Sequence, residues 1–351
     1  MPDTPPRTGP GDGAPARRVS VFALGGTIAM TAAGGGGIVP TLSAGQLLAA
    51  VPGLDRTGID LRVVDFRQLP GASLGFPDLT ALAGAVAEHL AGGADGAVVV
   101  QGTDTIEETA YLLDLRHPGP QPVVVTGALR GPAQAGADGP ANLLAAVQVA
   151  AAASFRDQGV LVVLADEVHA ARRVRKTHTT SPAAFASPDG GPLGRLVEGR
   201  PVALAALGHR TVVPAAGAGA PRVALVTLTL GDDGLLLGGL ADRVDGLVVA
   251  AFGAGHVPER LVPALADLAA AVPVVLASRT GSGPTLAATY GYPGSEADLL
   301  ARGLVRAGFL DPLKARLLLH VLLAAGADDA TIRAAFGAAG GYADPTTWPY
   351  P

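Results

Sequence analysis

The chain has no cysteine among its 351 residues. This absence excludes disulfides, thiolate metal sites and a cysteine nucleophile, and it is compatible with any compartment. Aromatic residues contribute only 4% of the sequence, although hydrophobic residues reach 49%. A core of that size must therefore be built from Ala, Val and Leu.

Lysine is nearly absent, because Lys176 and Lys314 are the only two and arginine supplies the remaining positive charge. A chain with this bias would be expected to replace a merely solvated lysine by arginine. Lysine can lose its proton when it is desolvated, whereas arginine effectively cannot. Lys176 is therefore a candidate for proton chemistry, and the alternative of a surface cation is disfavoured.

Basic segments and long apolar runs are also missing. The formal net charge is −5, which disfavours nucleic acid and anionic membranes as partners. No run of 18 residues is free of both charge and proline, so no membrane-spanning helix is expected. Residues 1–18 are polar and lack the apolar core of a secretory signal. We expect a cytoplasmic protein with a disordered tail over 1–18.

Short apolar runs alternate with segments of helical periodicity. The runs are continuously apolar rather than alternating, which is typical of a parallel sheet covered on both faces. The sequence becomes rich in Gly, Pro and Ala over 196–221, where we expect a linker. A second series of alternating strands and helices follows. Predicted strands cover 19–24, 61–66, 97–100, 122–125, 160–164, 223–230, 246–252 and 272–277, and predicted helices cover 78–90, 141–153 and 314–325.

Two threonine-centred loops follow predicted strands, at 25–29 and 102–105. Ligands of open parallel sheets bind at the carboxyl ends of strands. Either loop alone could be an ordinary strand-to-helix connection. Together with Asp104 and Lys176, they indicate a hydroxyl nucleophile with a base to activate it.

Five segments, in this order, resemble motifs of the bacterial-type L-asparaginase family. They are Leu24-Gly-Gly-Thr-Ile-Ala29, Gly102-Thr-Asp-Thr-Ile-Glu-Glu-Thr-Ala110, Ala137-Asp-Gly-Pro-Ala-Asn-Leu143, Arg175-Lys-Thr177 and Asp311-Pro-Leu-Lys-Ala-Arg316. The resemblance implies an α/β fold with a larger N-terminal doubly wound parallel-sheet domain, at 19–195, and a smaller C-terminal α/β domain, at 222–351. It also implies a homodimer or a homotetramer with sites shared between chains.

The resemblance also implies the chemistry, which is hydrolysis of the side-chain amide of L-asparagine. Thr27 would attack the amide carbon and form an acyl-enzyme, which water then hydrolyses. Thr103 would be hydrogen-bonded to a Lys176 amine kept neutral by burial. Asp104 would pair with the substrate's α-ammonium and with Lys176. The alternative for Asp104 is a helix N-cap.

Substrate binding is expected to involve Ser73, Gly102 and Ala128 of one chain. Glu296 would reach the substrate amine from the neighbouring subunit, or else it only opens a helix. Family members often carry a tyrosine in the lid after the first loop, but residues 30–40 contain none. We hypothesise that Tyr290 of the neighbouring subunit supplies the missing phenol; the alternative is that it merely packs.

Other functions fit less well. The first loop lacks the Gly-x-Gly-x-x-Gly pattern of dinucleotide-binding dehydrogenases. The seven histidines are scattered, and only His169 and His178 lie near each other, which disfavours a metal hydrolase. We expect neither a metal nor a cofactor. A glutaminase, a broader amidase, and a non-catalytic amino-acid-binding relative remain as alternatives.

Overall fold

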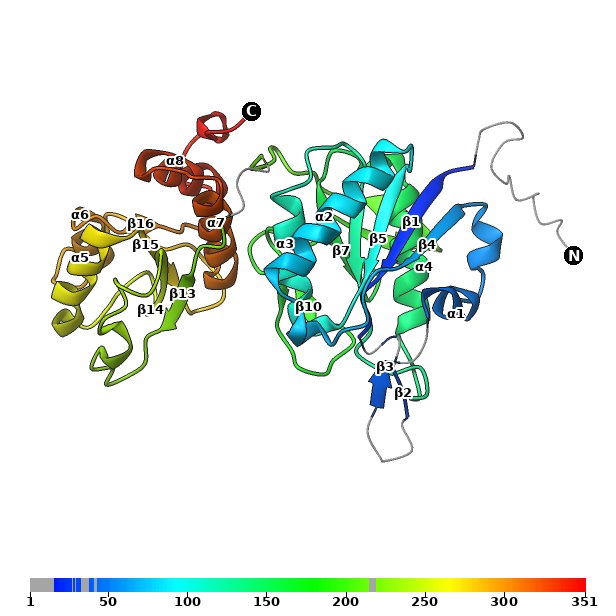
Figure 1. Cartoon of the computed structure of the whole chain (residues 1–351), viewed down its shortest axis with the longest axis horizontal. Helices are drawn as coiled ribbons and strands as arrows, with labels where there is room; N and C mark the ends of the chain where they lie inside the picture. The colour runs from blue at the N-terminus through cyan, green and yellow to red at the C-terminus, as the bar shows by residue number, and fades with distance from the viewer. Residues whose placement is uncertain (1–15, 27, 29, 33–37, 41–42, 215–218) are drawn as a thin grey trace, which may run out of the picture.

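The computed structural model describes residues 16–26, 28, 30–32, 38–40, 43–214 and 219–351. These residues form two α/β domains (Figure 1). The larger one contains an eight-stranded sheet in the order β12-β11-β8-β7-β6-β5-β1-β4. Its parallel part consists of β1 (Arg18–Ala23), β4 (Asp60–Asp65), β5 (Gly96–Val100), β6 (Val123–Thr126) and β7 (Val160–Leu164).

The chain order of these strands changes direction at β1. From β1 the chain enters β4 on one side and then crosses back to β5 on the other side of β1. Such a switch point is where open parallel sheets bind their ligands. Both predicted threonine loops begin here, directly after β1 and β5.

Helices cover both faces of the central strands β5, β6 and β7, which explains why these strands are buried along their whole length. Alternate residues of a strand point to opposite faces. In β5, Val99 faces the core under α2 (Phe76–Ala91) and α3 (Ile106–Asp114), whereas Val98 faces the core under α4 (Gly139–Ala151). Helix α1 (Ala44–Ala49) packs on the same side as α4.

The smaller domain holds a fully parallel sheet. Its strands are β13 (Val223–Thr227), β14 (Gly246–Ala251), β15 (Val274–Ser278) and β16 (Val305–Arg306). Helices α5 (Val262–Ala271) and α6 (Glu296–Ala301) cover one face, and α7 (Pro312–Ala324) and α8 (Asp329–Ala339) cover the other. Figure 1 shows α7 on the side that faces the larger domain and α5 and α6 on the far side.

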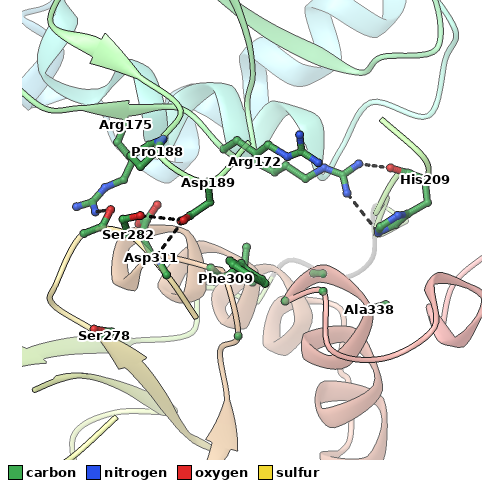
Figure 2. A pocket seen from close by; sticks show the side chains of 18 residues that line it. Arg172, Arg175, Pro188, Asp189, His209, Ser278, Ser282, Phe309, Asp311 and Ala338 are labelled. Carbon is green, nitrogen blue, oxygen red and sulfur yellow. Dashed lines mark hydrogen bonds between the residues drawn. The ribbon is translucent and has the colours of Figure 1, made fainter. Parts of the chain in front are cut away.

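The two domains share one hydrophobic cluster, in which α3 packs against α7. Polar contacts join them as well. Asp189 of the larger domain accepts hydrogen bonds from Ser282 Oγ at 2.8 Å and from the Gly283 amide at 3.0 Å (Figure 2).

Two of the predicted boundaries differ from the structure. The linker predicted at 196–221 begins inside β11 (Gly194–Val197), and β12 (Arg200–Ala203) then pairs antiparallel with it, so the sheet continues through Ala203. The parallel-sheet prediction overlooked this mixed edge, which also contains β8 (Glu167–Ala170). The tail predicted at 1–18 is ordered at its end, where Arg17 Nη1 pairs with Asp95 Oδ1 at 2.7 Å. Residues 1–15 lie outside the described part.

Candidate active site

Three glycine-containing loops close on one another at the switch point. A side chain at Gly26 would place its Cβ 2.2 Å from the Gly102 amide nitrogen, and one at Gly71 would lie 2.9 Å from the Gly102 carbonyl oxygen. Gly25 and Gly26 have φ values of 101° and 94°, which side chains rarely adopt. Glycine is therefore required for the first loop to approach the second. Thr27, the predicted nucleophile, follows at once but lies outside the described residues.

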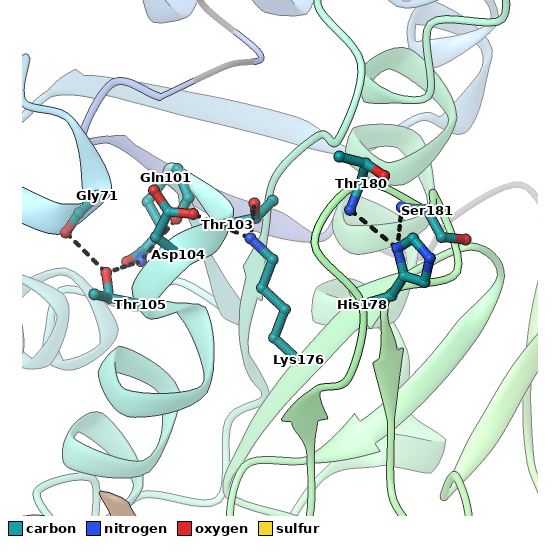
Figure 3. A network of polar contacts seen from close by, with 10 residues as sticks. Gly71, Gln101, Thr103, Asp104, Thr105, Lys176, His178, Thr180 and Ser181 are labelled. Carbon is teal, nitrogen blue, oxygen red and sulfur yellow. Dashed lines mark hydrogen bonds and ion pairs between the residues drawn. The ribbon is translucent and has the colours of Figure 1, made fainter.

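Lys176 connects the second loop to a distant part of the chain (Figure 3). Its Nζ donates to Thr103 Oγ1 at 2.9 Å and to Asp104 Oδ1 at 3.0 Å. The lysine side chain is 16% exposed, whereas that of Asp104 is 66% exposed. One carboxylate therefore faces both the lysine and open space where a cationic ligand could bind. The N-cap positions in this loop are Gly102 and Thr105, so Asp104 is not a helix N-cap.

A short hairpin holds Lys176 in position. Lys176 lies in β9 (Arg175–Lys176), which pairs with β10 (Phe185–Ala186). From the smaller domain, Lys314 Nζ donates to the Val174 carbonyl at 2.6 Å. Lys314 therefore anchors the residue that directly precedes the strand of Lys176.

Lys314 is fully buried, and two carboxylates whose side chains are 9% and 10% exposed lie beside it. Its Nζ lies 2.8 Å from Asp311 Oδ2 and 3.8 Å from Glu107 Oε2. Burial raises the pKa of Glu107, against the opposing effect of Lys314. Burial acts the same way on Asp311, but the charge and hydrogen bond of Lys314 outweigh it and keep the pKa of that carboxyl below its usual value. This cluster lies directly behind the loop that carries Thr103.

Sequence reasoning missed the residues that support the loops from behind. The buried Gln101 donates through Nε2 to the Gly102 carbonyl and to Thr105 Oγ1, both at 3.2 Å. The Thr105 hydroxyl donates in turn to the Gly71 carbonyl at 3.0 Å (Figure 3). The sequence does show a glutamine directly before Gly-Thr-Asp. Its supporting role could not be inferred from the sequence, because it depends on the Gly71 segment, which is distant along the chain.

The loop after β6 is held by two residues of the third motif. Asp138 accepts from the amides of Leu129 and Arg130 at 3.0 and 2.8 Å. Asn142 donates to the Gly127 carbonyl at 3.0 Å and accepts from the Ala165 amide at 3.0 Å. Ala128, a predicted substrate contact, is buried between them. The third motif thus holds the loop after β6 in position.

Three predicted site residues remain. Ser73 is exposed at the end of the short helix Gly71–Ser73, beside the Gly102 loop. Glu296 is the first residue of α6, a helix on the side of the smaller domain remote from the larger domain (Figure 1), and the Tyr290 amide is bonded to its carboxylate. One chain therefore does not bring them to Thr103.

The Glu296 carboxylate is buried and already bonded within its own chain. It accepts from the amides of Thr289 and Tyr290 at 2.9 Å each and lies 3.1 Å from His256 Nε2. The imidazole of His256 packs edge-on against the rings of Tyr290 and Tyr292, which are 44% and 48% exposed. Sequence reasoning did not single out His256.

His178 closes a turn, because its Nδ1 accepts from the amides of Thr180 and Ser181 at 3.1 and 3.0 Å (Figure 3). Over residues 43–214 and 219–351 and the shorter described stretches, no group of His, Asp and Glu could hold a metal ion. In the same part of the chain, none of the helices is long and apolar enough to cross a bilayer.

The sequence matches two family models, the N-terminal asparaginase domain over 18–206 and the glutaminase/asparaginase C-terminal domain over 222–336. The chain belongs to the asparaginase family. Members of this family are amide hydrolases. Its two-domain α/β fold agrees with the prediction from the sequence.

Individual members of the asparaginase family are similar over nearly the whole chain. A probable L-asparaginase of Deinococcus radiodurans is 39% identical over 91% of this chain and 97% of its own length. An L-asparaginase of Bacillus licheniformis is 33% identical over 88% and 96%. The crystal structure of a probable cytoplasmic L-asparaginase from Campylobacter jejuni superposes with a TM-score of 0.81 at 31% identity, covering 91% of this chain and 99% of that one.

Proposed function

We propose that the protein hydrolyses the side-chain amide of L-asparagine to L-aspartate and ammonia, through an acyl-enzyme on Thr27. The observation that carries the proposal is the contact of Lys176 Nζ with both Thr103 Oγ1 and Asp104 Oδ1, at 2.9 and 3.0 Å. It links a hydroxyl, a proton carrier and a carboxylate at the switch point of the sheet. The similarity to L-asparaginases supports the choice of substrate.

Asp104 is positioned to contact both Lys176 and the substrate. Its Oδ1 accepts from Lys176 Nζ at 3.0 Å, and most of the side chain is exposed. The α-ammonium of asparagine would therefore share this carboxylate with Lys176. Binding of the substrate would thus act on the residue that also holds Thr103.

The remaining parts of the reaction need oriented donors. The helical run from Thr103 into α3 starts without a side-chain cap, so its first amides are available to an anionic group. Ser73 and Gly102 lie beside this point and would bind the α-carboxylate. Thr27 follows Gly26, whose backbone touches Gly102, and attack by its hydroxyl would release ammonia.

A second copy of the chain would complete the site. Glu296 begins α6, which lies on the side of the smaller domain remote from the larger domain (Figure 1), and Tyr290 is bonded to it, so their proposed roles require a neighbouring subunit. The exposed rings of Tyr290 and Tyr292 offer that neighbour an aromatic surface in a chain with few aromatics. We propose a homodimer as the smallest active unit, with a tetramer formed from two such dimers.

The test is ammonia release from L-asparagine by the wild-type protein and by Thr27→Ala. We expect clear turnover by the former and a loss of at least about a thousandfold in kcat in the latter, on the order of 4 kcal/mol of transition-state stabilisation. Most of the activity surviving in Thr27→Ala would remove Thr27 as nucleophile. Binding of asparagine without ammonia release by the wild type would favour the amino-acid-binding alternative.

Glutaminase activity is the second candidate, because the C-terminal family model covers both activities. The same assay with L-glutamine gives the ratio of the two kcat/KM values. We expect asparagine to be preferred, and a ratio near one would identify a glutaminase-asparaginase.

A further inference from the structure

A cavity of about 330 Å³ lies between the two domains, away from the amide-hydrolysis site (Figure 2). The larger domain contributes Arg172, Arg173 and Arg175 to its wall, and the smaller domain contributes Phe309 and the turn at 338–341. Phe309 is 50% exposed, which is high for a phenylalanine. The cavity is therefore cationic on one side and apolar on the other.

Carboxylates act on these guanidinium groups only beyond ion-pair distance, Asp114 on Arg172 and both Asp311 and Glu107 on Arg175. In the described part of the chain, none of them forms an ion pair within 4.0 Å. The aspartates of the wall are otherwise engaged. Asp189 accepts from Ser282 and Gly283, and Asp311 pairs with Lys314 at 2.8 Å. The wall thus carries more positive charge than its own carboxylates balance.

Arg172 shows this most clearly. Its terminal nitrogens contact the carbonyl oxygen and ring nitrogen of His209, and its buried Nε has no hydrogen-bond partner. Burial lowers the pKa of Arg172. The pKa of His209 is lowered as well, mainly by burial and secondly by the nearby charge of Arg172. Buried cationic groups are costly unless an anion accompanies them, and a guanidinium fork suits carboxylate and phosphate oxygens.

The cavity adjoins the strand that carries Lys176. Neighbouring residues of a strand point to opposite sides. In β9, Lys176 points to Thr103, whereas Arg175 points to the smaller domain and donates to the Gly281 carbonyl. A ligand held by these arginines would therefore touch both domains and the strand behind the catalytic lysine.

We propose that this interdomain cavity is a binding site for a small multivalent oxyanion, either a phosphate ester or a polycarboxylate. The oxyanion accepts hydrogen bonds from Arg172 and Arg173, and the non-ionic part of the ligand lies against Phe309. Because the ligand contacts both domains, its binding stabilises their present arrangement and restrains β9.

The proposal is tested by titrating the intact protein with pyrophosphate and with citrate at constant ionic strength, using calorimetry and thermal unfolding. We expect saturable binding of at least one probe and a rise in Tm of a few degrees at saturation. Arg173→Gln removes a half-buried charge and should weaken binding at least about tenfold, the effect of one charged hydrogen bond. Preference for pyrophosphate or citrate identifies the class of ligand.

Arg195→Gln is the matched control, because Arg195 lies on the surface of β11 and pairs with Glu167. It should bind the probes like the wild type. If Arg173→Gln alters folding, Phe309→Ala provides a second variant on the opposite wall, and it should weaken an organic anion more than pyrophosphate. Absence of saturable binding of both probes, or equal binding by the wild type and the cavity variants, would overturn the proposal.

Discussion

Lys176→Arg keeps a positive charge beside Asp104 but removes the ability to accept a proton. Arginine is effectively never deprotonated in proteins. If Lys176 carries protons for Thr103, the variant should lose about a hundredfold or more in kcat, the range expected for general acid–base catalysis. If Lys176 is only a partner for Asp104, kcat should stay near that of the wild type.

The effect on stability should be small, and the structure indicates why. The Asp104 side chain is 66% exposed, and ion pairs of this kind contribute about 0.2–1 kcal/mol. The bond to Thr103 adds about 1 kcal/mol. Arginine retains part of both contacts, so the free energy of unfolding should fall by no more than about 1 kcal/mol.

The chain offers its own control, since it has only one other lysine. Lys314→Met leaves Asp311 and Glu107 buried without their cation, which should cost about 3–5 kcal/mol. Ammonia release and urea unfolding should therefore separate the two lysines, with Lys176→Arg stable and slow and Lys314→Met unstable. A near-normal kcat in Lys176→Arg would refute the proton role. A large loss of stability in Lys176→Arg would show that the contacts of Lys176 contribute more than about 1 kcal/mol to folding.

Four further predictions concern other parts of the site. Tyr290→Phe should lower kcat by roughly a hundredfold with little change in aspartate binding, while Tyr292→Phe serves as the control; equal rates in both variants and the wild type would dispose of the phenol hypothesis. Sedimentation at micromolar concentration should show at least a dimer, and a fully active monomer would contradict a shared site. Burial of Glu296 is outweighed by hydrogen bonds from Tyr290, Thr289 and His256, so its pKa lies below the usual value of a glutamate. Its contribution to stability is therefore present at neutral pH and is lost as the pH falls through that lowered pKa; Glu296→Gln should lack this acid-side loss in urea titrations between about pH 3 and 7. Gly26→Ala should be poorly folded or inactive, because its Cβ would meet Gly102 at 2.2 Å, and a soluble variant with wild-type activity would contradict the required loop contact.

The central parallel strands were predictable because burial on both faces leaves a continuous apolar run. The run predicted at 160–164 is β7 itself, and the one predicted at 97–100 differs from β5 by one residue. The antiparallel edge was missed because its strands do not form continuous apolar runs. β12 has exposed and half-buried residues and contains Pro201, so it has the composition of a loop. Its strand character comes from pairing with β11.

Residue type and scarcity singled out the second loop and its lysine, and the resemblance to the asparaginase family implied that they are paired. The hydrogen bond expected between Thr103 and Lys176 is present, while the catalytic role of the pair remains a prediction. Lys314 bears out the idea that neither lysine is merely solvated, although only Lys176 was singled out. The contacts of Gln101, Asn142 and His256 could not be predicted, because each depends on a partner that only the folded chain brings near.

The bond from Lys314 to the Val174 carbonyl has a consequence for the order of synthesis. The eight-stranded sheet is complete once Ala203 has been made, and amino-terminal domains generally fold first as the chain emerges from the ribosome. The group that anchors the segment before Lys176, however, belongs to one of the last helices. A nascent or truncated chain can therefore hold a finished sheet whose lysine strand is still unanchored. Amide hydrolysis would begin only when nearly the whole polypeptide has been released.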